Sequence, residues 1–201
     1  MSVGRPREFD TDQALDKALH VFRQKGFEGA SLPDLTEAMG INRPSLYAAF
    51  GNKEELFRKA LDRYTEKSLQ SLQAALSQPT AYKAVEKLLI GIADGSACSK
   101  TPKGCLLVHG ALACGEEAQP IRQELASRRM QTEFLLRQRF ERALAEGDLP
   151  SGTSASDLAG FIATVMQGMS VQSSGGAGRD ALLGIAQTAL RAIPASLKKN
   201  A

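Results

Sequence analysis

Tryptophan is absent from this sequence of 201 residues, and aromatic residues of all kinds make up only 5% of it. Large aromatic cages for cationic ligands are therefore not indicated. The three cysteines are too few, and odd in number, for a disulfide framework, which favours a cytoplasmic location. Mainly apolar stretches such as residues 104–114 are much shorter than the ~20 residues of a membrane span, and the first residues are charged. We therefore expect no membrane partner and no secretion.

A large excess of charge of one sign is also missing. Lys and Arg number 25 against 22 Asp and Glu, which gives a formal net charge of +3. Residues 1–58 even hold fewer basic than acidic side chains, 8 against 9. Because bulk charge does not indicate nucleic-acid binding, such a function has to rest on particular residues and their spacing.

The apolar residues, 43% of the chain, suffice for a substantial core. They recur at helical spacing, whereas alternating runs typical of strands are missing, so the sequence predicts an all-α fold. We expect a first helix from Thr11 to Gly26. Caps and helix breakers place the other helices at residues 32–39, 43–50, 53–77, 80–94, 105–114, 118–146, 154–172 and 179–193. The change to longer helices predicts two domains, residues 1–52 and 53–201.

The second and third helices, joined by a tight turn at Gly40, form a candidate helix-turn-helix. Leu46 and Phe50 are four residues apart and should face the core. The outward face of the third helix then carries Arg43, Pro44, Ser45 and Tyr47. Arginine pairs bidentately with guanine edges, which favours DNA recognition; an ordinary helical hairpin is the alternative.

The N-terminal sequence closely resembles the DNA-binding domain of TetR/AcrR-family transcriptional regulators over residues 9–57. Its most specific part is Leu46-Tyr47-x-x-Phe50-x-x-Lys53-Glu54-x-Leu56. The resemblance implies an all-helical homodimer whose larger domain binds a small molecule and then releases a palindromic operator. This sequence has Asn42-Arg43-Pro44 where many members have Ser, a variable residue and Gly, so no operator sequence is transferable.

Individual roles in DNA binding follow from helix geometry, and the resemblance agrees with them. Ser31 and the amides at its helix start should hold a phosphate, and the Tyr47 hydroxyl should reach another. Lys53 should grip the DNA backbone from the next helix start. Arg43, Pro44 and Ser45 remain as the residues that touch base edges.

The N-terminal segment Gly4-Arg5-Pro6-Arg7 resembles peptides that hook into the minor groove. Arg5 and Arg7 would be attracted by the negative potential of a narrow A·T-rich groove. A frayed chain terminus is the alternative, because first residues are usually disordered.

The larger domain shows no pattern of an enzyme. Its only histidine is His109, and neither a catalytic triad nor a nucleotide-binding loop accompanies it. A metal site would need Cys98, Cys105, His109 and Cys114, but paired C-x-x-C spacing is missing. We therefore expect neither catalysis, nor a metal, nor another cofactor.

Apolar and small residues line both of the last two helices, and the resemblance implies that these helices form a four-helix dimer interface. Simple core burial is the alternative. A pocket for a small, largely apolar effector is expected deeper in the same domain. The candidate lining residues are Leu88, Ile92, Leu106, Phe134, Phe161, Met166 and Met169.

Cys105 is the candidate effector-sensitive thiol. It should open a helix, where the unpaired amides favour a thiolate, and Lys103 and His109 lie close in sequence. Residues 104–107 resemble a TetR subgroup with a cysteine at the start of the sixth helix, which includes repressors responsive to electrophiles or oxidants. Cys98 and Cys114 are the possible resolving cysteines, and Cys98 is the better candidate because it lies near the predicted loop. A structural role as a small buried apolar residue is the alternative.

These features together predict a cytoplasmic, homodimeric repressor that binds double-stranded operator DNA. A small effector or a thiol-reactive electrophile would release it. The alternative is a helical regulator or adaptor that acts through a protein partner without a small-molecule ligand.

Overall fold

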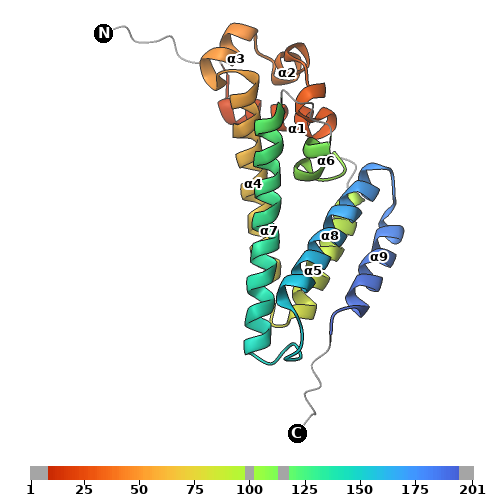
Figure 1. Ribbon diagram of the computed structural model, residues 1–201. Helices are drawn as coiled ribbons and strands as arrows, with labels where there is room; N and C mark the ends of the chain where they lie inside the picture. The colour runs from red at the N-terminus through yellow and green to blue at the C-terminus, as the bar shows by residue number, and fades with distance from the viewer. Residues whose placement is uncertain (1–8, 98–101, 113–117, 195–201) are drawn as a thin grey trace.

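A computed structural model describes residues 9–97, 102–112 and 118–194 of the chain. Within these ranges the regular elements are nine helices, and the predicted all-α fold is confirmed. Short helices gather at one end and long ones run away from it (Figure 1). The bounds are α1 (Thr11–Gly29), α2 (Leu32–Met39), α3 (Arg43–Phe50), α4 (Lys53–Leu76), α5 (Ala81–Ser96), α6 (Leu106–Leu112), α7 (Gln119–Ala145), α8 (Ala155–Ser174) and α9 (Arg179–Arg191).

Local capping explains where the short helices begin and end. The side chains of Ser31, Asn42 and Asn52 each accept a hydrogen bond from a backbone amide in the first turn of α2, α3 and α4. Gly40 ends α2 with φ 70°, a left-handed conformation that glycine adopts at little cost. At Gly26, where the sequence predicts the end of the first helix, φ is also 70° and α1 is kinked, although it continues to Gly29.

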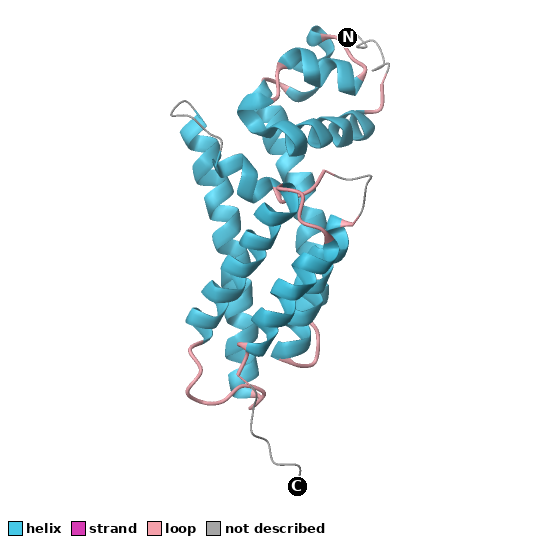
Figure 2. Cartoon of the chain, turned by 90° about the vertical axis from the view of Figure 1, so that its right-hand side faces the viewer, coloured by secondary structure: helices cyan, strands magenta, loops and turns pink. Residues whose placement is uncertain are grey.

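Two clusters of buried apolar side chains divide the fold. The N-terminal core joins α1, α2 and α3 to the first half of α4, and Leu106, Leu107, Ile121 and Leu125 of α6 and α7 complete it. The C-terminal core lies among α4, α5, α7, α8 and α9. Because α4 contributes to both cores, hydrophobic packing continues across residue 52. Figure 1 shows α4 running from the short helices toward the opposite end of the molecule, and Figure 2 shows the helices turned by 90°.

An ion-pair cluster fastens α1 to α4. The Arg63 guanidinium donates two hydrogen bonds of 2.7 Å to the Asp16 carboxylate and one of 3.0 Å to Asp12. Lys67 Nζ lies 3.5 Å from the same Asp16 carboxylate. The hydrogen bonds from Arg63 hold the pKa of Asp16 below its usual value.

Asp16→Asn is expected to lower the free energy of unfolding near pH 7 by about 1 kcal/mol or less, because the pair is partly exposed to solvent. The lowered pKa of Asp16 means that its contribution is present above the ordinary Asp value of 3.8 and is lost as pH falls further. Urea unfolding between pH 7 and pH 3 measures the difference from wild type, which should shrink below pH 4. Glu66→Gln, at an exposed position on α4, is the control. A difference that stays constant with pH would contradict this ion pair.

None of the helices in residues 9–97, 102–112 and 118–194 is long and apolar enough to cross a membrane.

Candidate nucleic-acid interface and regulatory site

The outer face of α3 presents a compact set of polar and small side chains. Leu46 and Phe50 are buried in the N-terminal core, as their spacing predicts. Arg43 and Pro44 are exposed, Ser45 is half-buried, and Tyr47 is 49% exposed. The structure therefore brings the four predicted α3 residues together on one helix, with Arg43 and Tyr47 free to reach a surface.

Ser31 serves as an internal cap in addition to its predicted contact with DNA. Its hydroxyl donates to the Asp34 carboxylate at 2.7 Å, and its backbone amide donates to the same oxygen at 3.0 Å. Lys25 Nζ pairs with the other oxygen at 2.7 Å, and these contacts keep the pKa of Asp34 well below its usual range. A phosphate at the start of α2 would therefore compete with the Asp34 carboxylate for the donors of Ser31. The ion pair with Lys25 neutralises the charge of that carboxylate.

Lys53, predicted to grip the DNA backbone, also holds two parts of the protein together. Its Nζ donates to the carbonyl of Glu28 at 3.3 Å and lies 4.8 Å from the centroid of the Phe27 ring. Burial lowers the pKa of Lys53. Lys59, which the sequence did not single out, donates to the carbonyl of Phe50 at 3.0 Å and so caps the C-terminus of α3.

Four residues of interest lie outside the part of the chain that the structure describes. They are Arg5 and Arg7 of the predicted minor-groove arm, and the cysteines Cys98 and Cys114. Their roles stay predictions.

Cys105 is half-buried and stands directly before α6, where its carbonyl accepts a hydrogen bond of 3.0 Å from the amide of His109. The Tyr64 hydroxyl donates to Cys105 Sγ at 3.4 Å. Burial raises the pKa of Tyr64, which keeps this hydroxyl protonated as a donor. Nothing in the sequence spacing indicates Tyr64, because it lies 41 residues before the cysteine.

His109 packs against the loop that precedes Cys105. Its Nε2 is buried and has no hydrogen-bond partner within the described part of the chain. A Cβ added at Gly104, whose φ is +86°, would lie only 2.4 Å from this nitrogen. Gly104 is therefore needed both for its backbone conformation and for the close approach of the imidazole.

The seven predicted pocket residues lie in three different surroundings. Leu88 and Met169 are buried in the C-terminal core, with Ile92 and Met166 packed against it, whereas Leu106 belongs to the N-terminal core. Phe134 and Phe161 are 43% and 41% exposed on the surfaces of α7 and α8. Helical spacing identified apolar faces correctly, but it could not separate two cores or distinguish a core from an exposed apolar face.

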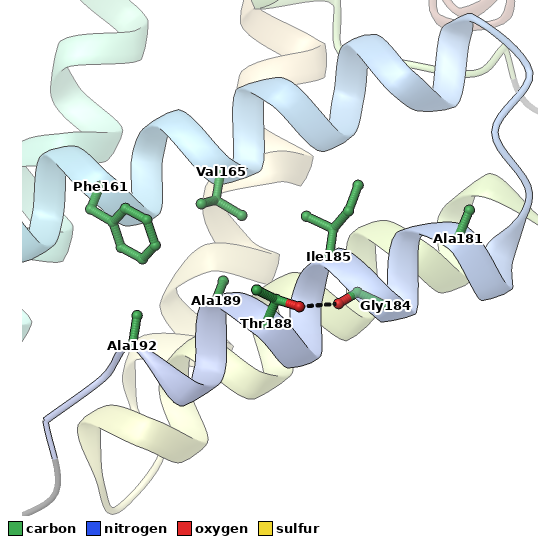
Figure 3. A pocket seen from close by; sticks show the side chains of 8 residues that line it. All are labelled: Phe161, Val165, Ala181, Gly184, Ile185, Thr188, Ala189 and Ala192. Carbon is green, nitrogen blue, oxygen red and sulfur yellow. Dashed lines mark hydrogen bonds between the residues drawn. The ribbon is translucent and has the colours of Figure 1, made fainter.

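A shallow apolar groove of about 510 Å³ runs between α8 and α9 (Figure 3). Ile185 is 38% exposed there and lines the same groove as Phe161. Large apolar side chains are rarely exposed together on a solvated surface. The lining residues are Phe161, Val165, Ala181, Gly184, Ile185, Thr188, Ala189 and Ala192. Small residues in α9 let another helix approach closely.

Comparisons with known proteins cover nearly the whole chain. The family described as "Bacterial regulatory proteins, tetR family" matches residues 14–60, and "Tetracyclin repressor-like, C-terminal domain" matches residues 82–190. The chain is 37% identical over 199 residues to the HTH-type transcriptional repressor ComR of Escherichia coli K12, covering 98% of this chain and 95% of ComR. It is 30% identical to the HTH-type transcriptional repressor BdcR of the same strain, with the same coverage.

Among solved structures, the TetR family transcriptional regulator CifR is similar in both fold and sequence. A cysteine mutant of CifR complexed with a 26-base-pair double-strand operator DNA has a TM-score of 0.92 and 43% identity to this chain. The match covers 95% of this chain and all of the CifR chain. The described fold is thus the fold of a relative bound to its operator.

Proposed function

Since this chain belongs to the TetR family of bacterial regulatory proteins, we propose that it acts as a homodimer on a palindromic operator and is released by a thiol-reactive effector. It is a DNA-binding transcriptional repressor and not an enzyme. In this proposal residues 1–52 bind DNA, and residues 53–201 dimerise and respond to the effector. The protein would work in the cytoplasm, where its operator is.

The observation that carries the DNA-binding proposal is the exposed face of α3. Its Arg43, Pro44, Ser45 and Tyr47 are held outward because Leu46 and Phe50 anchor the opposite face in the N-terminal core. A dimer would present two such helices to major grooves about one helical turn, roughly 34–36 Å, apart. Arg43 then reads base edges, while Tyr47, Lys53 and Ser31 contact phosphates.

Arg43→Ala is expected to reduce discrimination between the operator and unrelated duplexes by about 5- to 150-fold, the range for one lost bidentate base contact. Lys53→Ala should instead weaken binding to all duplexes and lower the salt slope by about 1. The operator would be selected from a random duplex pool, and fluorescence anisotropy at several salt concentrations would measure both variants.

Lys53→Ala also removes the contact with Glu28, so thermal unfolding of this variant has to be measured alongside. Arg122→Ala, at an exposed position on α7, serves as the control for loss of a positive charge. If both interface variants kept wild-type affinity, discrimination and salt slope, α3 would not be the recognition helix.

The proposed release centres on Cys105. The thiol is half-buried beside the Tyr64 hydroxyl, and α6, which follows it, contributes Leu106 and Leu107 to the N-terminal core. A covalent change at this sulfur would therefore act next to the packing that supports the helix-turn-helix. Operator-bound CifR, 43% identical, is a cysteine mutant, which fits a role for cysteines in this group. Cys98 remains the proposed resolving partner, with His109 assisting the thiol.

A further inference from the structure

Arg23 connects α1 to the loop that precedes Cys105. Its Nη2 donates to the carbonyl of Pro102 at 2.5 Å and lies 3.5 Å from the carbonyl of Gly104. These contacts join residues about eighty positions apart, and α1 also packs directly against α6 (Figure 1). Arg23 is thus a direct link between the helix-turn-helix domain and the loop at Cys105.

The same guanidinium is also coupled to the thiol through Tyr64. Its central carbon lies 5.5 Å from the centroid of the Tyr64 ring, and the Tyr64 hydroxyl donates to Cys105 Sγ at 3.4 Å. Cys105 contacts Tyr64, Tyr64 contacts Arg23, and Arg23 contacts Gly104, which precedes Cys105 in the chain. We call these four residues the junction cluster. A displacement of one member of the junction cluster therefore disturbs its contact with the next member.

We propose that Arg23 and Tyr64 are the coupling residues that transmit a modification of Cys105 to the helix-turn-helix domain. The inference rests on the proposed function, because it presumes that modification of Cys105 releases the operator. Arg23 would pass the change on to the helix-turn-helix domain, because it is the member of the junction cluster that lies on α1.

Alkylation by N-ethylmaleimide illustrates the step. The Cys105 sulfur adds to the maleimide double bond, a carbon–sulfur bond replaces the π bond, and the thiol proton passes through water to the neighbouring carbon. The adduct has to occupy space beside a hydroxyl that now lies 3.4 Å from the sulfur. Tyr64 must therefore move, and Arg23 loses the ring on which it packs.

The junction cluster is present in a fold that matches an operator-bound relative with a TM-score of 0.92. In this proposal the arrangement of the unmodified chain is the one that binds DNA. The contacts of the junction cluster stabilise this arrangement, and their loss shifts the population away from it. Removing Arg23 should therefore weaken operator binding in the unmodified protein. Alkylation of Cys105 should then reduce operator affinity by a smaller factor in the variant that lacks Arg23.

The test uses the full chain with Cys98→Ser and Cys114→Ser, so that Cys105 is the remaining thiol. Arg23→Ala is compared with Lys17→Ala, which removes a positive charge from an exposed position of the same helix. Intact mass follows alkylation, and anisotropy measures operator affinity before and after it. Alkylation should weaken binding by about 5- to 150-fold in the parent and in Lys17→Ala, but by less than about threefold in Arg23→Ala.

Equal losses on alkylation in Arg23→Ala and Lys17→Ala would overturn the coupling role and leave the proposed function intact. A parent that is fully alkylated and still binds its operator unchanged would overturn both. Arg23→Lys keeps the charge but loses the planar group that packs on Tyr64. Its loss of operator affinity on alkylation should therefore lie between those of the parent and Arg23→Ala. This variant decides the question if Arg23→Ala fails to fold, because full wild-type sensitivity in Arg23→Lys would contradict the proposal.

Discussion

Replacing Ile185 with arginine is expected to abolish dimerisation and to weaken operator binding by about 100- to 10,000-fold, the gain that two linked binding modules ordinarily provide. Ile185 is 38% exposed in the groove between α8 and α9. A second copy of this face would bury it beside Phe161 and Val165. An arginine there would have to lose its hydration without a partner charge, which strongly disfavours association.

Analytical ultracentrifugation would measure the oligomeric state, and binding to full and half operators would measure the effect on DNA affinity. Gln187→Arg introduces the same charge on α9 at an exposed position outside the groove, and it should leave both properties unchanged. An Ile185→Arg protein that stayed dimeric and bound its operator normally would exclude this face as the dimer interface.

Cys105→Ser is expected to bind the operator like wild type and to lose its response to a thiol-reactive electrophile completely. The serine hydroxyl can still accept the hydrogen bond from Tyr64, so the unmodified arrangement should persist. It is not a nucleophile toward a maleimide, whereas wild-type affinity should fall by about 5- to 150-fold on alkylation. Release would be measured by anisotropy with an excess of N-ethylmaleimide.

Cys114→Ser should keep the full response to alkylation, because alkylation of Cys105 needs no second thiol. Cys98→Ser should keep alkylation-driven release and lose only a disulfide formed after oxidation. Unaltered release in Cys105→Ser would remove the thiol-sensor proposal and direct attention to a conventional ligand pocket.

Most helix boundaries and the outward face of α3 could be predicted from the sequence because they depend on neighbouring residues. A cap such as Asn42 acts within three residues of its own position, and Gly40 supplies a left-handed turn by itself. The spacing of Leu46 and Phe50 orients α3, because side chains four apart share a helical face. These features needed no knowledge of the rest of the chain.

Contacts between distant segments could not be predicted in this way. The sequence indicates Cys105 as a candidate thiol, but only the tertiary structure places Tyr64 beside its sulfur and Arg23 beside its loop. The predicted pocket residues likewise fell into different surroundings, with Leu106 in the N-terminal core and Phe161 on the surface. Apolar periodicity indicates which face of a helix is apolar, but it does not indicate which other segment packs against that face.

Sequence alone was therefore enough to predict the all-helical fold, the helix-turn-helix and the residues that α3 presents. Only the three-dimensional structure shows that α4 belongs to both cores and that Arg23 ties the loop before α6 to α1. The physical reason is the range of the interactions. Caps and helical spacing act over a few residues, whereas packing and side-chain hydrogen bonds join segments whose separation in sequence carries no information about their distance in space.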